Sequence, residues 1–421
     1  MDTFKCLLCL LGGSGPFLGS LAGAQERESL AGEKAAQALK EAVQAEAQQY
    51  NMHYGPVGFQ VGGGLRLGYT DNTFYSDTNR VHDFVIYPEA TLAAFMQVSE
   101  LNTIKLSVGL GYEYYVNNSV LNGNTPQVNP DSELAFNLFV GAFHIRFHEK
   151  FSYLQTLFIN TTLSGQDILF NFNDVGIFSR WDNTAGFDVD WDLNQVILSA
   201  GYNHENFVSS TESFRYLNRA SEWVTATISF LIGDQARFGV ESAGNVHDYE
   251  TETTLNDNWR ARVGGFLEVK PLEKISFRGG GGSDRAQYDD AGKSSNFKTY
   301  YAYGRASQDT RFFTHSLSAG HESMLGNNAN NLETTYVRYS ISSPIVRTVD
   351  LGVNGAVHFD KEYGGAFTEK FTYYVAGLKV GYQAYKHCRT ELGYEYLLKD
   401  SALPLRDFYR NRVTVGVTFT F

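Results

Sequence analysis

The sequence predicts an all-β fold: a transmembrane, antiparallel, up-and-down β-barrel of about eighteen strands, within a range of roughly 14 to 18. Three observations lead to this prediction. Residues 412–421, RVTVGVTFTF, alternate apolar and polar side chains and end on an aromatic residue. Similar alternating segments follow one another from Val57 onward. The joints between them alternate between short and long, which is the loop pattern expected of an outer-membrane barrel.

The C-terminal segment places five apolar residues on one face, because strand side chains alternate between the two faces. These residues are Val413, Val415, Val417, Phe419 and Phe421. An aromatic side chain is well placed at a bilayer interface, beside headgroups and water. The segment resembles the assembly signal of bacterial outer-membrane β-barrels, which implies that the barrel-assembly machinery recognises Phe419 and Phe421. The alternative is the last strand of a soluble sandwich.

The composition excludes several classes of protein. The 421 residues contain no apolar run of 18 or more, which excludes ordinary transmembrane helices. A barrel escapes that test, since only every second residue of a strand faces lipid. The net charge of −12 argues against nucleic acid as a partner. Cys6 and Cys9 lie near the start and Cys388 is alone in the remainder, so we expect neither a disulfide framework nor a cysteine metal site.

The N-terminal part divides into two predicted segments. Residues 1–24 are predicted to be a secretory signal peptide, because Lys5 precedes an interrupted apolar core and small residues at 22–24 suit cleavage. Residues 25–56 are predicted to be a periplasmic helix or tether, since 30–49 are rich in the helix formers Ala, Glu, Gln and Lys. Disorder is the alternative for this stretch. Residues 57–421 show no second change of composition and are predicted to form one outer-membrane β-barrel.

The barrel segments follow from alternation and from clusters of turn residues. They are expected at about 57–73, 83–98, 102–117, 133–147, 151–163, 183–192, 194–206, 220–232, 236–247, 257–270, 274–287, 296–307, 311–322, 332–343, 347–360, 370–385, 389–398 and 408–421. Short joints, predicted to be periplasmic turns, lie at 99–101, 148–150, 193, 233–235, 271–273, 308–310, 344–346 and 386–388.

The two faces of each segment predict which side meets lipid. Ile104, Leu106 and Val108 alternate with Lys105 and Ser107, and the same pattern recurs along the chain. An interior that holds Lys, Glu, Asp and Arg cannot be dry, because unpaired buried charge is very costly. We therefore expect a watered lumen, or one plugged by polar loops. About eighteen strands leave room for an aqueous channel.

The first strands carry a family resemblance. Residues 62–74 read GGGLRLGYTDNTF, and they are followed by Asp83-Phe84, Tyr87-Pro88-Glu89 and the stretch GYEYY at 111–115. This opening resembles that of the Putative beta-barrel porin 2 family over residues 60–115, and the rest of the chain is compatible with it. The resemblance implies an outer-membrane barrel without a defined substrate. Members often occur beside exopolysaccharide machinery, which implies a glycan-related role as an alternative.

No motif predicts catalysis, a metal or a cofactor. Asp188, Asp190 and Asp192 share one face of a strand, where three carboxylates could hold Ca²⁺ or could form an acidic lumen wall, the interpretation we favour. His144 and His148 lack the companions of a metal or catalytic motif. We expect that the protein is not an enzyme and that it has no cofactor. An outer-membrane hydrolase is the alternative.

A pore constriction is predicted from one loop and several arginines. The third long joint, 164–182, reads SGQDILFNFNDVGIFSRWD and is apolar enough to be costly in water, so we expect it to fold into the lumen. An external loop packed on its neighbours is the alternative. The candidate constriction residues are Asp167, Asp174, Arg180 and Asp182 of this joint, and Arg260, Arg262, Arg278 and Arg412 of later inward rows, with Arg410 beside them.

The predicted function is an outer-membrane, porin-like channel for passive diffusion of small polar solutes in a Gram-negative cell, reached by signal-directed export. The alternatives are a barrel associated with exopolysaccharide export and a closed structural or adhesion barrel. The expected partners are outer-membrane lipid, the barrel-assembly machinery, and small polar solutes or glycan.

Overall fold

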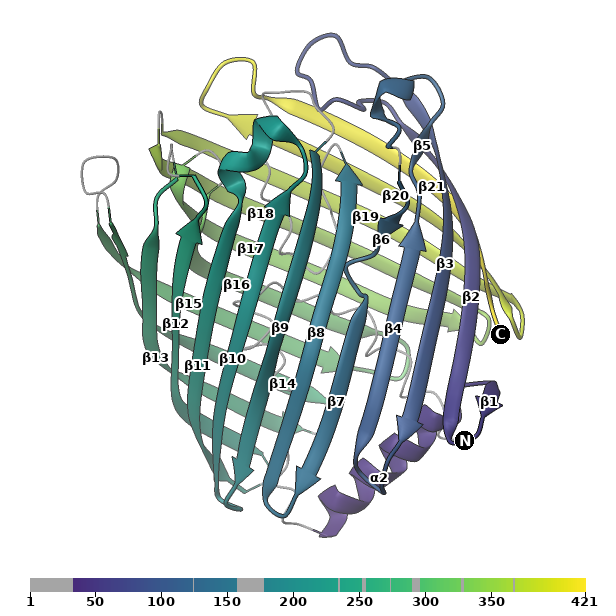
Figure 1. Ribbon diagram of the computed structural model, residues 1–421, viewed down its shortest axis with the longest axis vertical. Coiled ribbons are helices and arrows are strands. Elements are labelled where there is room, and N and C mark those ends of the chain that lie inside the picture. Colours follow the sequence, from purple (N-terminus) through teal and green to yellow (C-terminus); the bar gives the residue numbers. More distant parts are fainter. Residues whose placement is uncertain are drawn as a thin grey trace.

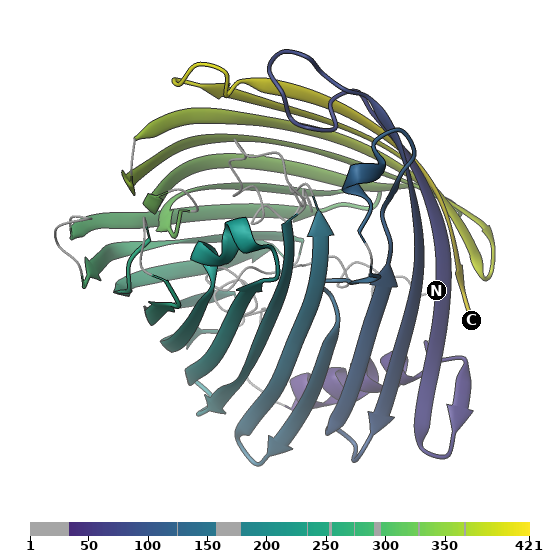
Figure 2. The same cartoon turned by 45° about the horizontal axis from the view of Figure 1, so that its top comes forward.

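The computed structural model describes residues 33–123, 125–156, 178–233, 235–251, 255–272, 274–289, 296–326, 329–365 and 368–421. In this part of the chain eighteen antiparallel strands close into a barrel, as predicted (Figures 1 and 2). The wall strands are β2 (Val57–Thr70), β3 (Asp83–Gln97), β4 (Thr103–Gly111), β7 (Glu133–Val140), β8 (Phe143–Thr156), β9 (Phe178–Asp192), β10 (Val196–Ser209), β11 (Arg219–Ile232), β12 (Ala236–Tyr249), β13 (Asn258–Leu272), β14 (Ile275–Tyr288), β15 (Phe297–Asp309), β16 (Thr314–Met324), β17 (Ala329–Val346), β18 (Val349–Gly365), β19 (Glu369–Tyr385), β20 (Cys388–Ser401) and β21 (Phe408–Thr420). Short additional elements are α2 (Glu33–Ala47), β1 (Met52–Tyr54), β5 (Tyr114–Tyr115), η1 (Ser119–Leu121), β6 (Gln127–Val128) and η2 (Glu212–Leu217).

The barrel closes where the first wall strand meets the last. β2 pairs with β21 from Gly62 opposite Thr420 to Thr70 opposite Arg412. Just beyond this ladder, Phe421 and Val61 exchange two backbone hydrogen bonds, with N–O distances of 2.8 and 3.0 Å. A closed ladder has no open strand edge, and only such a barrel satisfies its backbone inside lipid. The role of Phe421 as an assembly signal stays a prediction.

At the other end of the β2–β21 ladder, Asp71 and Asn72 hydrogen-bond to the last strand. The carboxylate of Asp71 accepts hydrogen bonds from the backbone nitrogen and the Nδ2 of Asn411, at 2.7 and 2.6 Å. Nδ2 of Asn72 donates to the backbone oxygen of Tyr409 at 2.8 Å. Asn72 is fully buried. This part of the motif therefore connects the first strand to the last, which sequence pattern alone did not reveal.

Short turns gather at one end of the barrel and longer connections at the other (Figure 1). We call these ends the turn rim and the loop rim. All the predicted short joints except one coincide with, or adjoin, a turn of the turn rim.

The exception is the joint predicted at 148–150, which is wrong. β7 ends at Val140 and β8 begins at Phe143, so 148–150 lie within β8. Gly141 has a φ of +58°, a left-handed conformation that glycine adopts at little cost in a tight hairpin. Residues 148–150 were predicted to form a turn because charged residues are common in turns. Charged side chains also suit the inner face of a barrel strand.

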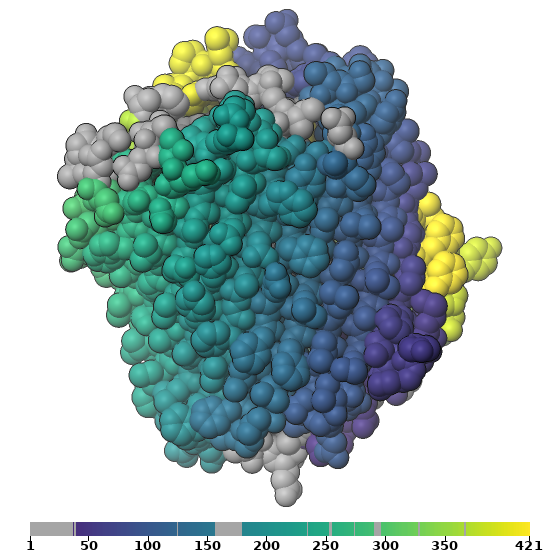
Figure 3. All heavy atoms as spheres, in the orientation of Figure 1, coloured from purple at the N-terminus to yellow at the C-terminus, as the bar shows by residue number. Residues whose placement is uncertain are grey.

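The outer surface of the barrel is apolar. Leu92, Val224, Val263, Leu392 and Val415 are among the exposed hydrophobic side chains. Seen from the side, the wall formed by β7 to β12 is closed (Figure 3). Exposed apolar surface of this extent would be costly in water, and it suits contact with lipid.

Aromatic pairs mark both edges of this apolar band on neighbouring strands β8 and β9. Phe143 and Trp191 stack near the turn rim with ring centroids 5.3 Å apart. Tyr153 and Trp181 lie closer to the loop rim, with centroids 4.6 Å apart. Paired aromatic girdles of this kind are typical of the two membrane interfaces.

Helix α2 lies at the turn rim, beside β3 and β4 (Figure 1). Its Glu46 carboxylate is 2.5 Å from Nζ of Lys105, which belongs to the inner face of β4. Lys40 pairs with Glu100 of the β3–β4 turn at 2.6 Å. Val43 is buried. Residues 33–47 of the segment predicted as a helix or tether therefore form a helix docked at the mouth of the barrel. No helix among the described residues has the length and apolar character needed to cross a membrane.

This docking should weaken in acid. The hydrogen bond and charge of Lys40 hold the pKa of Glu100 below its ordinary value of 4.5. Because the pKa of Glu100 is lower when the helix is docked, its ion pair with Lys40 stabilises docking at pH values above the pKa of the undocked state. This stabilisation is lost as the pH falls through the lower pKa of the docked state. We expect the amide protection factors of residues 33–47 to fall between about pH 7 and about pH 3. Lys40→Ala should reduce protection already near neutrality, while Gln37→Ala, on an exposed position of the helix, serves as the control. Protection factors that do not change with pH would show that other contacts hold the helix.

Candidate functional site

The inner wall of the barrel carries most of the charged side chains, and it is the candidate functional surface. Alternation sends every second residue of each wall strand inward. Charged residues on adjacent strands then meet, as with Arg237 and Glu268 at 2.7 Å and Arg262 and Asp284 at 2.8 Å. Pairing lowers the cost of holding charge against the barrel wall.

Two predicted arginines lie inside this ion-paired wall. Arg260 is 3 % exposed, and its Nη2 donates to Oδ1 of Asn331 at 2.8 Å and to the hydroxyl of Tyr288 at 3.2 Å. Arg262 is 6 % exposed and donates a hydrogen bond to Asp284 through Nε. Arg260 on β13 thus contacts both β14 and the more distant β17, and Arg262 connects β13 to β14. Their role in a constriction stays a prediction.

Arg278 belongs to the same network. Its guanidinium lies 3.7 Å from the carboxylate of Glu268 and 3.9 Å from that of Glu241. Glu241 also accepts hydrogen bonds from the hydroxyls of Tyr301 and Tyr303, at 3.0 and 2.8 Å. The charge of Arg278 is thus compensated within the wall.

The two tyrosine rings lie flat on this wall because glycines leave room beneath them. A Cβ at Gly264 would stand 2.3 Å from the hydroxyl of Tyr301, and one at Gly280 would stand 2.7 Å from the ring of Tyr303. Neither glycine could carry a side chain without displacing the ring. Part of the glycine-rich stretch of β14 therefore serves ring packing on the inner wall.

Arg180 and Asp182 do not belong to a loop, which corrects the prediction for them. Both lie on β9, which begins at Phe178, and Nε of Arg180 donates to Oδ2 of Asp182 at 2.8 Å. The alternation of the sequence already begins here, so the backbone continues as strand. Asp167 and Asp174 lie outside the described residues, and the inward folding of their loop stays a prediction.

The inward face of β9 carries a row of carboxylates. Asp188 lies 3.7 Å from Nδ1 of His148, and Asp190 lies 3.5 Å from Nδ1 of His144. Asp192 continues the row towards the turn rim. Among the described residues no three side chains are placed to hold a metal ion.

The guanidinium nearest to this row along β8 is already engaged. Arg146 lies between the two histidines in sequence, and its Nη2 is 2.5 Å from Oε1 of Glu133 on β7. The ion pair therefore adds no net charge to this part of the wall.

The wall opposite β9 also carries ion pairs. β9 and β18 are nine strands apart in either direction around the eighteen-strand ring, so they face each other across the barrel (Figure 1). Beside β18, Arg389 contacts Asp350 at 2.9 Å and Glu391 at 3.0 Å, and Lys379 contacts Glu391 at 2.8 Å. Lys379 and Arg389 are thus each paired with a carboxylate within this wall.

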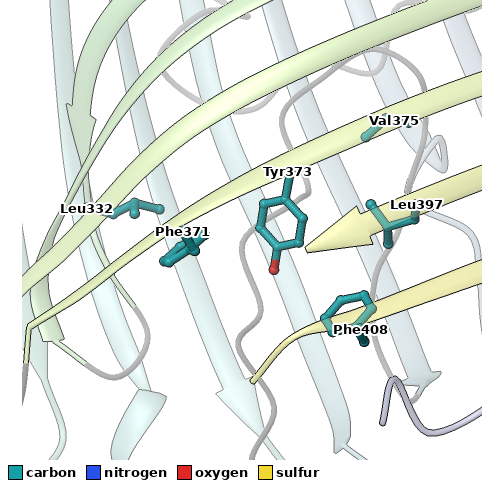
Figure 4. Packing of buried hydrophobic residues seen from close by; sticks show 6 residues of the cluster. All are labelled: Leu332, Phe371, Tyr373, Val375, Leu397 and Phe408. Carbon is teal, nitrogen blue, oxygen red and sulfur yellow. The ribbon is translucent and has the colours of Figure 1, made fainter. Parts of the chain in front are cut away.

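One part of the inner wall is apolar, which the sequence analysis missed. A buried cluster near the loop rim consists of Leu332, Phe371, Tyr373, Val375, Leu397 and Phe408 (Figure 4). The residues of β19 in this cluster are odd-numbered, as are Glu369 and Lys379, so all of them lie on the inner face of the strand. This numbering was the sequence signal that could have placed the apolar residues on the inner face. It was overlooked because inward rows were expected to be polar.

Comparison with known proteins shows the fold and leaves the family open. No family model matches the sequence, and no curated protein matches it significantly. Among solved structures, OccK9 (OpdG) of Pseudomonas aeruginosa is similar with a TM-score of 0.50 and 10 % identity, over 86 % of this chain and 98 % of that one. A BenF-like porin from Pseudomonas fluorescens Pf-5 gives 0.49 and 10 %, over 86 % and 99 %. The outer membrane protein opdK from Pseudomonas aeruginosa gives 0.46 and 13 %, also over 86 % and 99 %.

Proposed function

We propose that this protein is an outer-membrane, porin-like channel through which small polar solutes diffuse passively. The observation that carries the proposal is a closed eighteen-strand barrel with an apolar outer face and a polar, ion-paired inner face. Charged groups such as Asp188, with its side chain 39 % exposed, require water beside them. A hydrated lumen of this kind conducts small solutes, and its wall charges set their preference.

The orientation follows from the two rims. The turn rim with α2 faces the periplasm and the loop rim faces outward, after export directed by residues 1–24 and folding by the barrel-assembly machinery. The likeness of residues 60–115 to the Putative beta-barrel porin 2 family supports this placement.

We infer the sign preference from the row of partly exposed carboxylates on β9. Asp188 and Asp190 face the lumen with side chains 39 % and 23 % exposed, and Asp192 continues the row. A wall with a net negative strip raises the local concentration of cations. The channel should therefore pass small cations more readily than small anions.

Recording from the purified protein in planar lipid bilayers tests this proposal. We expect discrete conductance steps of uniform size, and in a salt gradient a reversal potential of the sign that cation preference gives. Swelling of liposomes in isotonic sugars should show that uncharged polar solutes also pass. Protein unfolded by heating before addition is the control. A folded barrel that inserts but neither conducts nor swells liposomes would contradict the proposal and favour a closed structural barrel.

A further inference from the structure

The connection between β2 and β3, residues 71–82, sends one side chain to the inner wall at the loop rim. The ring of Tyr75 meets that of Phe408 on the inner face of β21 edge to face, with centroids 5.3 Å apart. Arg410, two residues along the same strand face, donates a hydrogen bond to the Tyr75 hydroxyl, and its Cζ lies 4.8 Å from the centre of the ring. Tyr75 therefore forms a second layer on the inner wall, farther into the barrel than the side chains of the strands.

The backbone of the connection is held in a conformation that directs this ring inward. Tyr75 has a φ of 53°, a left-handed conformation that is unfavourable for a residue other than glycine. The fully buried Asn72 spans the turn, since its Nδ2 donates to the oxygen of Ser76 at 2.8 Å and its Oδ1 accepts from the nitrogen of Ser76 at 2.9 Å. The nitrogen of Thr73 donates to the oxygen of Val81 at 2.7 Å. Strain of this kind persists where surrounding contacts fix it, and it is concentrated at functional sites.

The charges around the ring are balanced. Arg410 is 5 % exposed and also bonds the carboxylate of Glu395 on β20. Arg412 and Glu113 are the other charged groups that act on the Tyr75 hydroxyl. Burial raises the pKa of Tyr75, so the phenol stays neutral. The ring thus adds bulk to this side of the lumen without adding charge.

We propose that Tyr75 is a size-determining residue of the channel: its inward ring, held by the Asn72 turn, narrows the lumen at the loop rim. This inference rests on the proposed function. It assigns the narrowing to the first loop, where the sequence analysis expected the third. Because the surrounding charges are balanced, the ring limits the size of the solutes that pass and leaves the preference between cations and anions unchanged.

Single-channel recording of two substitutions at this position tests the proposal. Tyr75→Ala removes the ring and should raise the conductance by about 1.5-fold to threefold, an order-of-magnitude expectation for widening a narrow section. Its reversal potential should equal that of the unaltered protein. Tyr75→Phe keeps the ring and should keep the original conductance. Tyr385→Ala, which alters a tyrosine that is 77 % exposed at the turn rim, is the matched control and should have no effect.

A thiol variant separates a failure of this inference from a failure of the proposed function. Tyr75→Cys, in a protein whose Cys6, Cys9 and Cys388 are replaced by Ser, should conduct more than the unaltered channel until a bulky thiol reagent blocks it. If the unaltered protein conducts, but Tyr75→Ala leaves conductance unchanged and the reagent has no effect, the proposed role of Tyr75 is overturned and the channel function stands. If the unaltered protein does not conduct although it is folded and inserted, the channel function itself fails.

Discussion

Glu369→Ala should destabilise the barrel by about 3–5 kcal/mol, the cost of removing one partner from a buried ion pair. Glu369 is fully buried on the inner face of β19, and its Oε1 lies 2.7 Å from Nζ of Lys399, which is 1 % exposed. Its Oε2 accepts from Arg406 of the β20–β21 connection, and Ser401 donates to Oε1 at 2.7 Å. The substitution would leave two buried cations without this carboxylate. Urea unfolding in lipid vesicles, or the temperature of the heat-modifiable shift in gel mobility, measures the loss.

Two further variants make this expectation specific. Glu391→Ala removes a carboxylate that pairs with Lys379 and Arg389 at the other end of the wall, where the side chain is 29 % exposed, so it should cost about 1 kcal/mol or less. Replacing Glu369 with Leu and Lys399 with Met together should recover part of the stability, since Lys399 already lies against the Phe371 ring at 4.5 Å. Equal unfolding midpoints for Glu369→Ala and Glu391→Ala would show that burial of the triad does not matter.

The fold was predictable because its signals are local. Alternation with a period of two identifies each wall strand, and the glycine or charged cluster at each short joint identifies the turn. The error at 148–150 has the same origin. Charged residues occur both in turns and on the inner face of a barrel, so charge alone could not separate the two. A change in which residues face outward could have separated turn from strand. Outward residues are even-numbered up to Val140 and odd-numbered from Phe143 on, so a turn must lie between them.

The candidate site was predictable in its residue types but not in its partners. Arg260 was expected on an inward row, yet its closest hydrogen bond goes to Asn331, 71 residues away. Tyr75 and Arg410 meet across 335 residues, because the first and last strands adjoin only after closure. β13 and β17, which carry Arg260 and Asn331, are not adjacent, so such contacts depend on the order of the strands around the barrel and on how far their register is staggered. Alternation within a strand determines the face of a residue and carries no information on its partners across the lumen.

Asp188→Asn combined with Asp190→Asn should lower the cation-to-anion permeability ratio severalfold. The two carboxylates face the lumen with side chains 39 % and 23 % exposed, so removing both weakens the negative potential of the β9 strip without deleting buried volume. The interaction of a passing ion with one such charge near 4 Å is about 1 kcal/mol in water and about 4 kcal/mol in a less polar channel, and 1.4 kcal/mol corresponds to a tenfold ratio. Reversal potentials in a salt gradient at about pH 8, where imidazoles are uncharged, measure the change. Asp400→Asn, at an exposed carboxylate near the loop rim, is the control and should leave the ratio unchanged. A double variant with the original ratio would place the ion path away from β9, and the source of any cation preference would then lie in the loops.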